Sequence, residues 1–78
     1  MWTALRQWRR RKKWSLARTA AELGLRSKHA WRTVLRWENL EQAPRDRNFD
    51  ALKEISGDLL NEASYYAARN RARAKAAA

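Results

Sequence analysis

Apolar residues recur every three or four positions along most of this chain, which is the spacing of one face of an α-helix. The first two segments with this spacing are residues 2–12 and 16–23, and we predict a helix over each, with a break near Lys13. Their inward-facing apolar positions are Leu5, Trp8, Leu16, Ala20 and Leu23. No run of alternating apolar and polar residues indicates a strand.

The third predicted helix, residues 28–39, has two different faces. Ala30, Val34 and Trp37 lie at i, i+4 and i+7 and are expected to pack inward. A second stripe at i, i+4 and i+8 is basic and consists of Lys28, Arg32 and Arg36. One helix therefore combines an apolar docking face with a basic face, which is the layout of a helix presented to the major groove of DNA.

Two further helices complete the prediction: residues 48–56, and a last helix from Asn61 to about Arg69. Ser, Asn and Gly residues at the expected helix ends are suitable caps and stops, namely Ser15, Ser27, Asn61, Gly24 and Gly57. We predict an all-α bundle of four to five helices around a central helix-turn-helix. Residues 1–69 would form this domain, and residues 70–78 a basic, alanine-rich tail, either a frayed helical extension or disordered.

Charge and composition narrow the classes of function. The chain has 78 residues, enough for one small domain, and a net charge of +10, which indicates a polyanionic partner. It has no cysteine and one histidine, so we expect no disulfide, metal site or cofactor. The absence of a long apolar run predicts no membrane span or signal peptide, and hence an intracellular protein.

Short motifs in this order resemble the Cro/CI-type (XRE-like) helix-turn-helix repressor family over about residues 5–66. The run Ala20-Ala21-Glu22-Leu23-Gly24-Leu25 looks like that family's Ala-x-x-x-Gly-Val/Leu core. Thr33-Val34-Leu35-Arg36-Trp37-Glu38 resembles the end of its recognition helix. Pro44, Leu52, Ile55 and Gly57 resemble its fourth helix and stop, and the later Asn61 and Tyr65-Tyr66 look like those of short phage and prophage regulators.

The chain departs from the family pattern in two places. The stretch from Gly24 to Glu38 is longer by about one helical turn, so either the recognition helix is longer or the preceding turn is wider. The family usually has Gly just after the Glu, where this chain has Asn39-Leu40. We expect Asn39 to take the left-handed conformation there, because asparagine adopts it at modest cost.

The resemblance implies a sequence-specific, repressor-like transcription regulator that binds double-stranded DNA as a homodimer, with the helix over about residues 28–39 in the major groove. It also implies a place in the bacterial cytoplasm or nucleoid, or in a phage-infected cell. Arg32 and Arg36 would read bases, because arginine pairs with guanine through two hydrogen bonds. Arg9 and Glu38 occupy the places of a structural ion pair in that family. Flanking or phosphate contacts would come from Lys28, His29, Thr33, Arg10, Arg11, Lys12, Ser15 and Arg26.

Other interpretations remain open from the sequence. The basic run Arg9–Lys13, interleaved with Trp2, Trp8 and Trp14, also resembles membrane-active Trp/Arg peptides, although a DNA-backbone clamp fits the helix-turn-helix better. We expect Trp8 and Trp37 in the core, and Trp31 either stacked on a partner or covering the core. No catalytic constellation or small-molecule site is evident, so an enzyme is not predicted. The competing functions are a nonspecific nucleoid or RNA-binding protein and an antitoxin- or adaptor-type interaction protein.

Overall fold

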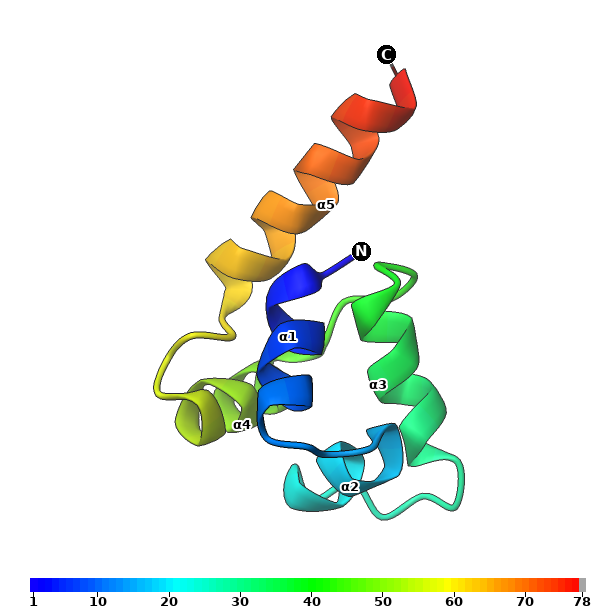
Figure 1. Cartoon of the computed structure of the whole chain (residues 1–78), viewed down its shortest axis with the longest axis vertical. Helices are drawn as coiled ribbons and strands as arrows, with labels where there is room; N and C mark the ends of the chain where they lie inside the picture. The colour runs from blue at the N-terminus through cyan, green and yellow to red at the C-terminus, as the bar shows by residue number, and fades with distance from the viewer. Residues whose placement is uncertain (78) are drawn as a thin grey trace.

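The computed structural model describes residues 1–77, which contain five helices and no strand. The helices are α1 (Thr3–Arg11), α2 (Leu16–Glu22), α3 (Ala30–Glu38), α4 (Asp46–Ser56) and α5 (Glu62–Ala77). Figure 1 shows α1 to α4 gathered into one bundle, with α5 extending away from it. The predicted all-α class is therefore confirmed. None of the helices in the described range is both long and apolar enough to cross a membrane.

The core joins the N-terminus to the start of α5. Trp2 lies edge-to-face against Tyr65 and Phe49, with ring centroids 5.1 and 6.3 Å away, and its Nε1 donates to Ser64 Oγ at 2.9 Å. This geometry gives each ring an edge-to-face partner in addition to its burial. The buried apolar residues are Trp2, Leu5, Trp8, Ala20, Ala30, Val34, Trp37, Phe49, Leu52, Leu60, Tyr65 and Ala68. The expectation that Trp8 and Trp37 are core residues is confirmed.

Most helix ends follow the predicted caps. Ser15 Oγ accepts a hydrogen bond from the Arg18 N–H at 3.0 Å, and Asn61 Oδ1 accepts one from the Ser64 N–H at 2.9 Å. Gly57 closes α4 in the left-handed conformation with φ of +63°. These ends are specified locally, because a side chain or a glycine satisfies backbone groups that the helix leaves unpaired.

The structure corrects the predicted start of α3 and the predicted conformation of Asn39 at its end. The helix begins at Ala30 with His29 at its N-cap, and Ser27 Oγ instead accepts from the His29 N–H at 3.3 Å within the preceding turn. The additional residues therefore widen the turn and do not lengthen α3. At the other end Asn39 has φ of −84°, and Leu40 takes the left-handed conformation with φ of +60°.

Hydrogen bonds explain why Leu40 has this conformation. The Leu40 N–H donates to the Trp37 carbonyl at 3.1 Å, and the Glu41 N–H donates to the Arg36 carbonyl at 2.9 Å. This pair of bonds is the Schellman motif, whose left-handed residue stands one place beyond the helix cap. Asn39 is the cap itself, so the left-handed position falls on the next residue.

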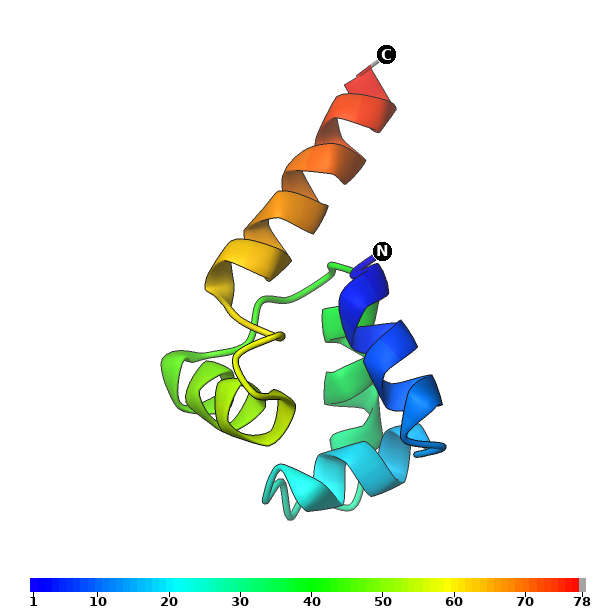
Figure 2. The same cartoon turned by 60° about the vertical axis from the view of Figure 1, so that its left-hand side comes forward.

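The last helix is longer than predicted. Tyr65 and Ala68 are buried in the bundle, and the helix then continues beyond Arg69 as far as Ala77. Figures 1 and 2 show its C-terminal half extending away from the other helices in both views. Of the two forms expected for residues 70–78, residues 70–77 adopt the helical one, and residue 78 lies outside the described residues.

Candidate nucleic-acid interface

The helix-turn-helix is formed by α2, which packs against α3, and the turn between them. Gly24 has φ of +79°, a conformation that costs glycine little. The Gly24 N–H donates to the Ala21 carbonyl and the Leu25 N–H to the Ala20 carbonyl, both at 3.0 Å. These bonds end α2 with a Schellman motif and send the chain into the wide turn before α3.

Packing fixes which face of α3 meets solvent. Val34 and Trp37 are completely buried, whereas Arg32 and Arg36 are exposed. The two arginines stand four residues apart, so they project from neighbouring turns of one helical face. Lys28 is also exposed, but it precedes α3 and lies in the turn, so the helical part of the predicted basic stripe is limited to Arg32 and Arg36.

The predicted ion pair between Arg9 and Glu38 is present and is bidentate. Arg9 Nε donates to Glu38 Oε2 at 2.7 Å and Nη2 donates to Oε1 at 3.3 Å, with side-chain exposures of only 14% and 3%. Arg9 Nη1 also donates to the Trp14 carbonyl at 3.0 Å. One guanidinium thus joins the end of α1, the α1–α2 connection and the end of α3. The same guanidinium also compensates the negative charge of the Glu38 carboxylate at the end of α3.

Trp31 lies at the start of α3 and is half-buried. The guanidinium carbon of Arg32 lies 5.3 Å from the centroid of its ring, within the range of a cation–π contact. In this structure the indole therefore contacts the predicted base-reading arginine. A cation–π contact restricts the rotamers of the long Arg32 side chain and so lowers the entropy cost of placing its guanidinium on a partner.

A second aromatic and basic cluster lies where α1 meets α2. Trp8 and Trp14 are edge-to-face at 5.4 Å, and Lys12 Nζ lies 6.0 and 5.9 Å from the two ring centroids. The Arg18 guanidinium carbon lies 5.4 Å from the Trp14 ring, and Arg18 Nε pairs with Glu22 at 3.2 Å. Arg18 was not among the residues predicted from the sequence, although its four-residue spacing from Trp14 and Glu22 was a usable signal.

The predicted DNA-contacting residues lie on accessible surface, except that Thr33 is half-buried. The exposed ones are Arg10, Arg11, Lys12, Ser15, Arg26, Lys28, His29, Arg32 and Arg36. Figures 1 and 2 place the C-terminus of α1, α2 and the N-terminus of α3 at the same end of the molecule. Within residues 1–77, the cations among them form no ion pair with an acidic side chain, so their charge is available to an external anion.

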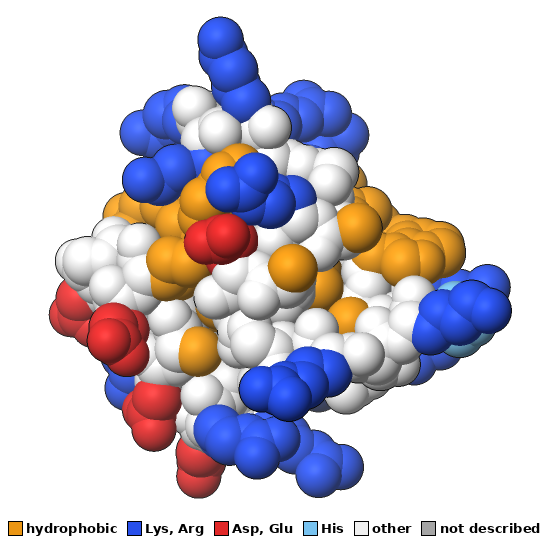
Figure 3. Space-filling model, turned by 90° about the horizontal axis from the view of Figure 1, so that it is seen from below, with side chains coloured by type: hydrophobic (Ala, Val, Ile, Leu, Met, Phe, Trp, Pro, Cys, Tyr) orange, Lys and Arg blue, Asp and Glu red, His pale blue; other side chains and the backbone are white. Residues whose placement is uncertain are grey.

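Acidic side chains are concentrated elsewhere. Asp46, Asp50, Glu54 and Asp58 are exposed on or next to α4. Figure 3, which views the molecule from the end where α2 lies, shows most Asp and Glu side chains at the left, and Lys and Arg side chains along the top, right and lower edges. The charge is therefore unevenly distributed, with a basic surface over α1 to α3 and an acidic side at α4.

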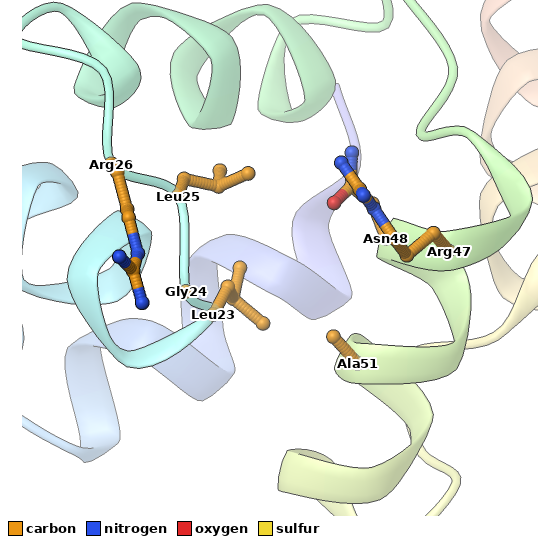
Figure 4. Close-up of a pocket in the computed structure, with 7 residues that line it drawn as sticks. All are labelled: Leu23, Gly24, Leu25, Arg26, Arg47, Asn48 and Ala51. Atoms are coloured by element: carbon orange, nitrogen blue, oxygen red, sulfur yellow. The ribbon is translucent and has the colours of Figure 1, made fainter.

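A hollow of about 500 Å³ separates the α2–α3 turn from α4. Figure 4 shows Leu23 and Leu25 extending from the turn toward Ala51 on α4. Arg26 and Arg47 stand at the edges, and Asn48 completes the polar part of the lining. Arg47 and Asn48 could not be predicted from the sequence, because their place beside the turn is set by how α4 packs and not by any local motif.

Comparisons of the chain with protein-family models, with curated proteins and with solved structures found no match.

Proposed function

We propose that this protein binds double-stranded DNA in a sequence-specific manner and acts as a repressor-like transcription regulator, with α3 in the major groove. The observation that carries the proposal is the placement of Arg32 and Arg36. Both extend from the solvent face of a helix whose opposite face is anchored by Val34 and Trp37. An α-helix with its side chains is about 10–12 Å across, which fits a major groove about 12 Å wide.

The two arginines supply the chemistry of base reading. A guanidinium donates two parallel hydrogen bonds to guanine O6 and N7, a pattern unique to that base in the major groove. The anchored helix places both donors in advance, so little side-chain order is lost on binding beyond that of the arginines themselves. The Arg32–Trp31 contact at 5.3 Å adds to this pre-organisation.

Affinity would come chiefly from the surrounding cations. Arg10, Arg11 and Lys12 at the end of α1, with Lys28 and Arg26 before α3, are exposed and suit phosphate contacts on either side of the groove. Such contacts neutralise backbone charge and release counter-ions without reading sequence. Ser15, His29 and Thr33 have polar side chains of suitable reach for the same flanking role.

The proposal predicts two-fold symmetry for the complex of protein and DNA. A small reader of this kind gains specificity by binding as a homodimer to two half-sites about 34 Å apart, one helical turn of DNA. The resemblance of the sequence to short phage and prophage regulators points in the same direction. We therefore expect a palindromic operator.

The direct test is selection of bound sequences from a random DNA pool at near-physiological salt. Enrichment of a palindromic consensus containing guanine would support the proposal and give the symmetry of the complex. Recovery of unselected sequences with undiminished binding would favour nonspecific nucleoid binding, an alternative favoured by the many exposed cations outside α3.

A further inference from the structure

The C-terminal half of α5, residues 69–77, is here called the projecting segment. Ala68 is the last buried residue of the helix, and no residue from position 69 to 77 is buried. A hollow of about 390 Å³ lies between the segment and the bundle, lined by Met1, Asn39 and Leu40 on one side and by residues from Arg69 to Ala76 on the other. One stripe of the segment, with Arg69 and Ala72 half-buried, faces the bundle across this hollow, and its other faces are exposed to solvent.

Its side chains carry one sign of charge. The cations are Arg69, Arg71, Arg73 and Lys75, and no acidic residue follows Glu62 in the sequence. Arg69 and Arg73 lie one turn apart on one face, and Arg71 and Lys75 lie one turn apart on another. The segment is consequently positive on more than one side, and within residues 1–77 it makes no ion pair that lowers this charge.

The remaining side chains decide which kind of partner fits. Between the cations stand alanines and Asn70, with no large apolar residue. A helix that inserts into a bilayer surface or a protein groove needs a stripe of Leu, Phe or Trp, which is missing from the projecting segment. Cations spaced along a rod without an apolar stripe suit a phosphate backbone, where neutralised charge supplies the binding free energy.

The segment projects toward the end of the molecule opposite α2 and the N-terminus of α3. In Figures 1 and 2 the chain's C-terminus lies at one end of the molecule, while α2 and the N-terminus of α3 lie at the opposite end. The longest dimension of the fold is 38 Å. Arg69 and Arg73 line the hollow beside Asn39 and Leu40 at the end of α3, whereas Arg71 and Lys75 do not line it. We therefore expect Arg71 and Lys75 to face away from a straight duplex held by the arginines of α3.

We propose that the projecting segment is a second, sequence-independent DNA contact that binds the phosphates of a different duplex, so that the protein bridges two DNA segments. This inference rests on the proposed function for the first duplex. It adds a second site of different chemistry: α3 would read bases at one end, and the segment would neutralise phosphates at the other.

The test uses the full-length protein, an operator duplex fixed to beads and a labelled random-sequence duplex in solution. The key variant is Arg71→Ala/Arg73→Ala/Lys75→Ala, which removes three exposed cations and retains helix-forming residues. With about 0.9 counter-ion released per phosphate contact, it should lower capture of the labelled duplex about 100-fold at 0.15 M salt. Its affinity for the operator alone should stay within about twofold, because charges beyond the Debye length of about 8 Å are screened.

Two matched variants locate the effect. Arg71→Lys/Arg73→Lys keeps the charge and should bridge as well as the wild type, since phosphate contact needs a cation and not a fork of donors. Arg10→Ala/Arg11→Ala/Lys12→Ala removes the same charge from the other end and should weaken operator binding itself. Circular dichroism and sedimentation mass of each variant identify any loss through unfolding or changed assembly.

The inference would be overturned if the wild type did not bridge, or if the Ala variant of the segment bridged fully. It would also be overturned if that variant lost operator binding equally, or if its sedimentation mass changed, because the segment would then be a contact between copies of the protein. Preferential capture of single-stranded RNA would also overturn it. If the first duplex shows no sequence preference but bridging still depends on the segment, the sequence-specific function fails and the second contact stands.

Discussion

At the scale of single residues, Glu38 shows how much the fold depends on one compensated charge. Its carboxylate is buried and receives both donors of the Arg9 fork. Water does not reach this carboxylate, so the guanidinium is its main source of compensation. A buried pair of this kind costs desolvation, and its disruption leaves an uncompensated charge inside the protein.

We predict that Arg9→Leu lowers the free energy of unfolding by about 3–5 kcal/mol, because Glu38 then remains buried without a cation. The matched control is Arg18→Leu, which breaks the exposed pair with Glu22 and should cost no more than about 0.5 kcal/mol. Urea unfolding followed by tryptophan fluorescence measures both. Similar small losses in the two variants would mean that the buried pair is not structurally important.

Lys13 is strained in a way that the sequence did not reveal. Its φ is +61°, in the left-handed region, while the preceding Lys12 is right-handed with φ of −73°. The Lys13 N–H donates to the Arg10 carbonyl and the Trp14 N–H to the Arg9 carbonyl, which again forms a Schellman motif. A lysine therefore stands where glycine is the favoured residue.

Replacing Lys13 with Gly should raise the free energy of unfolding by about 1 kcal/mol, because the left-handed conformation costs glycine little. Lys12→Gly is the matched control: it removes the same charge next door but introduces glycine at a right-handed position, and should lower stability by about 0.5–1 kcal/mol. Thermal melts of the two variants should shift in opposite directions. Shifts of the same sign would show that charge, not backbone conformation, dominates at this turn.

At the scale of helices, the elements were largely predictable and their junctions were not. Ser15, Asn61 and Gly57 ended or began helices as expected, because a cap acts through neighbouring backbone groups. Ser27 did not cap α3, since the wide turn keeps its hydroxyl on the His29 N–H. Competing local hydrogen bonds of this kind are weakly encoded in residue type alone.

In the candidate site, too, features within one helix were predictable and contacts between distant segments were not. The outward direction of Arg32 and Arg36 followed from the apolar spacing of Val34 and Trp37, which the structure confirms as buried. The position of Arg47 beside the α2–α3 turn depends on the approach of α4, a contact between segments far apart in sequence. Whether α5 extends beyond Arg69 was left open, because alanine and arginine favour a helix but the segment has no apolar face to bury.

The junction between α4 and α5 gives a prediction about acid. Glu62 stands in the first turn of α5, and its pKa is lowered by a hydrogen bond with its own backbone N–H and then by Lys53, whose Nζ lies 3.2 Å from Oε1. A carboxyl with a lowered pKa in the fold stabilises the protein above its ordinary pKa of 4.5. That contribution is lost as pH falls through the lowered value.

Glu62→Gln should therefore melt at a lower temperature than the wild type near pH 7, and the difference should vanish once the pH falls below the lowered pKa. Glu54→Gln, an exposed carboxylate on α4, serves as a comparison at each pH. Thermal melts at several values between pH 7 and pH 2 test this. A gap between Glu62→Gln and the wild type that persists in strong acid would assign the effect to side-chain shape and not to ionisation.

The proposed specificity for an operator depends on the two arginines of α3. If Arg36 donates to guanine as proposed, Arg36→Ala should cost about 1–3 kcal/mol on the selected operator and less on random DNA. Arg32→Ala should act in the same direction but less strongly, because the widened turn lies directly before the first turn of α3. Competition binding against operators changed at single base pairs gives the position that each residue reads.

The matched control for this helix is Arg36→Lys, which keeps the positive charge but lacks the planar fork of donors. It should lose discrimination on the operator and retain binding to random DNA. Equal losses on both DNAs for the Ala variant, with full recovery in the Lys variant, would mean that Arg36 meets only phosphate.

At the scale of the whole molecule, the uneven distribution of charge would determine how salt acts on the proposed DNA binding. Basic residues cover the end formed by α1 to α3, and exposed acids lie on or beside α4. With a net charge of +10, the protein attracts a polyanion over several ångströms, and the acidic side favours approach by the opposite face. The same field makes affinity fall steeply with ionic strength.

Replacing Arg10, Arg11 and Lys12 with Ala tests the share of this field that belongs to α1. These side chains are exposed, and Lys12 lies near the Trp8 and Trp14 rings without an acidic partner within residues 1–77. If each meets one phosphate, the slope of log K against log salt should flatten by about 0.9 for each lost contact, or about 2.7 in total. Operator and random DNA should be affected alike, because phosphate contacts carry no sequence information. Titrations at several salt concentrations on both DNAs measure this. Weakening on the operator alone would mean that these residues contact bases and not phosphates. An unchanged slope would mean that the duplex does not contact α1, so that α3 would bind DNA without phosphate contacts from α1.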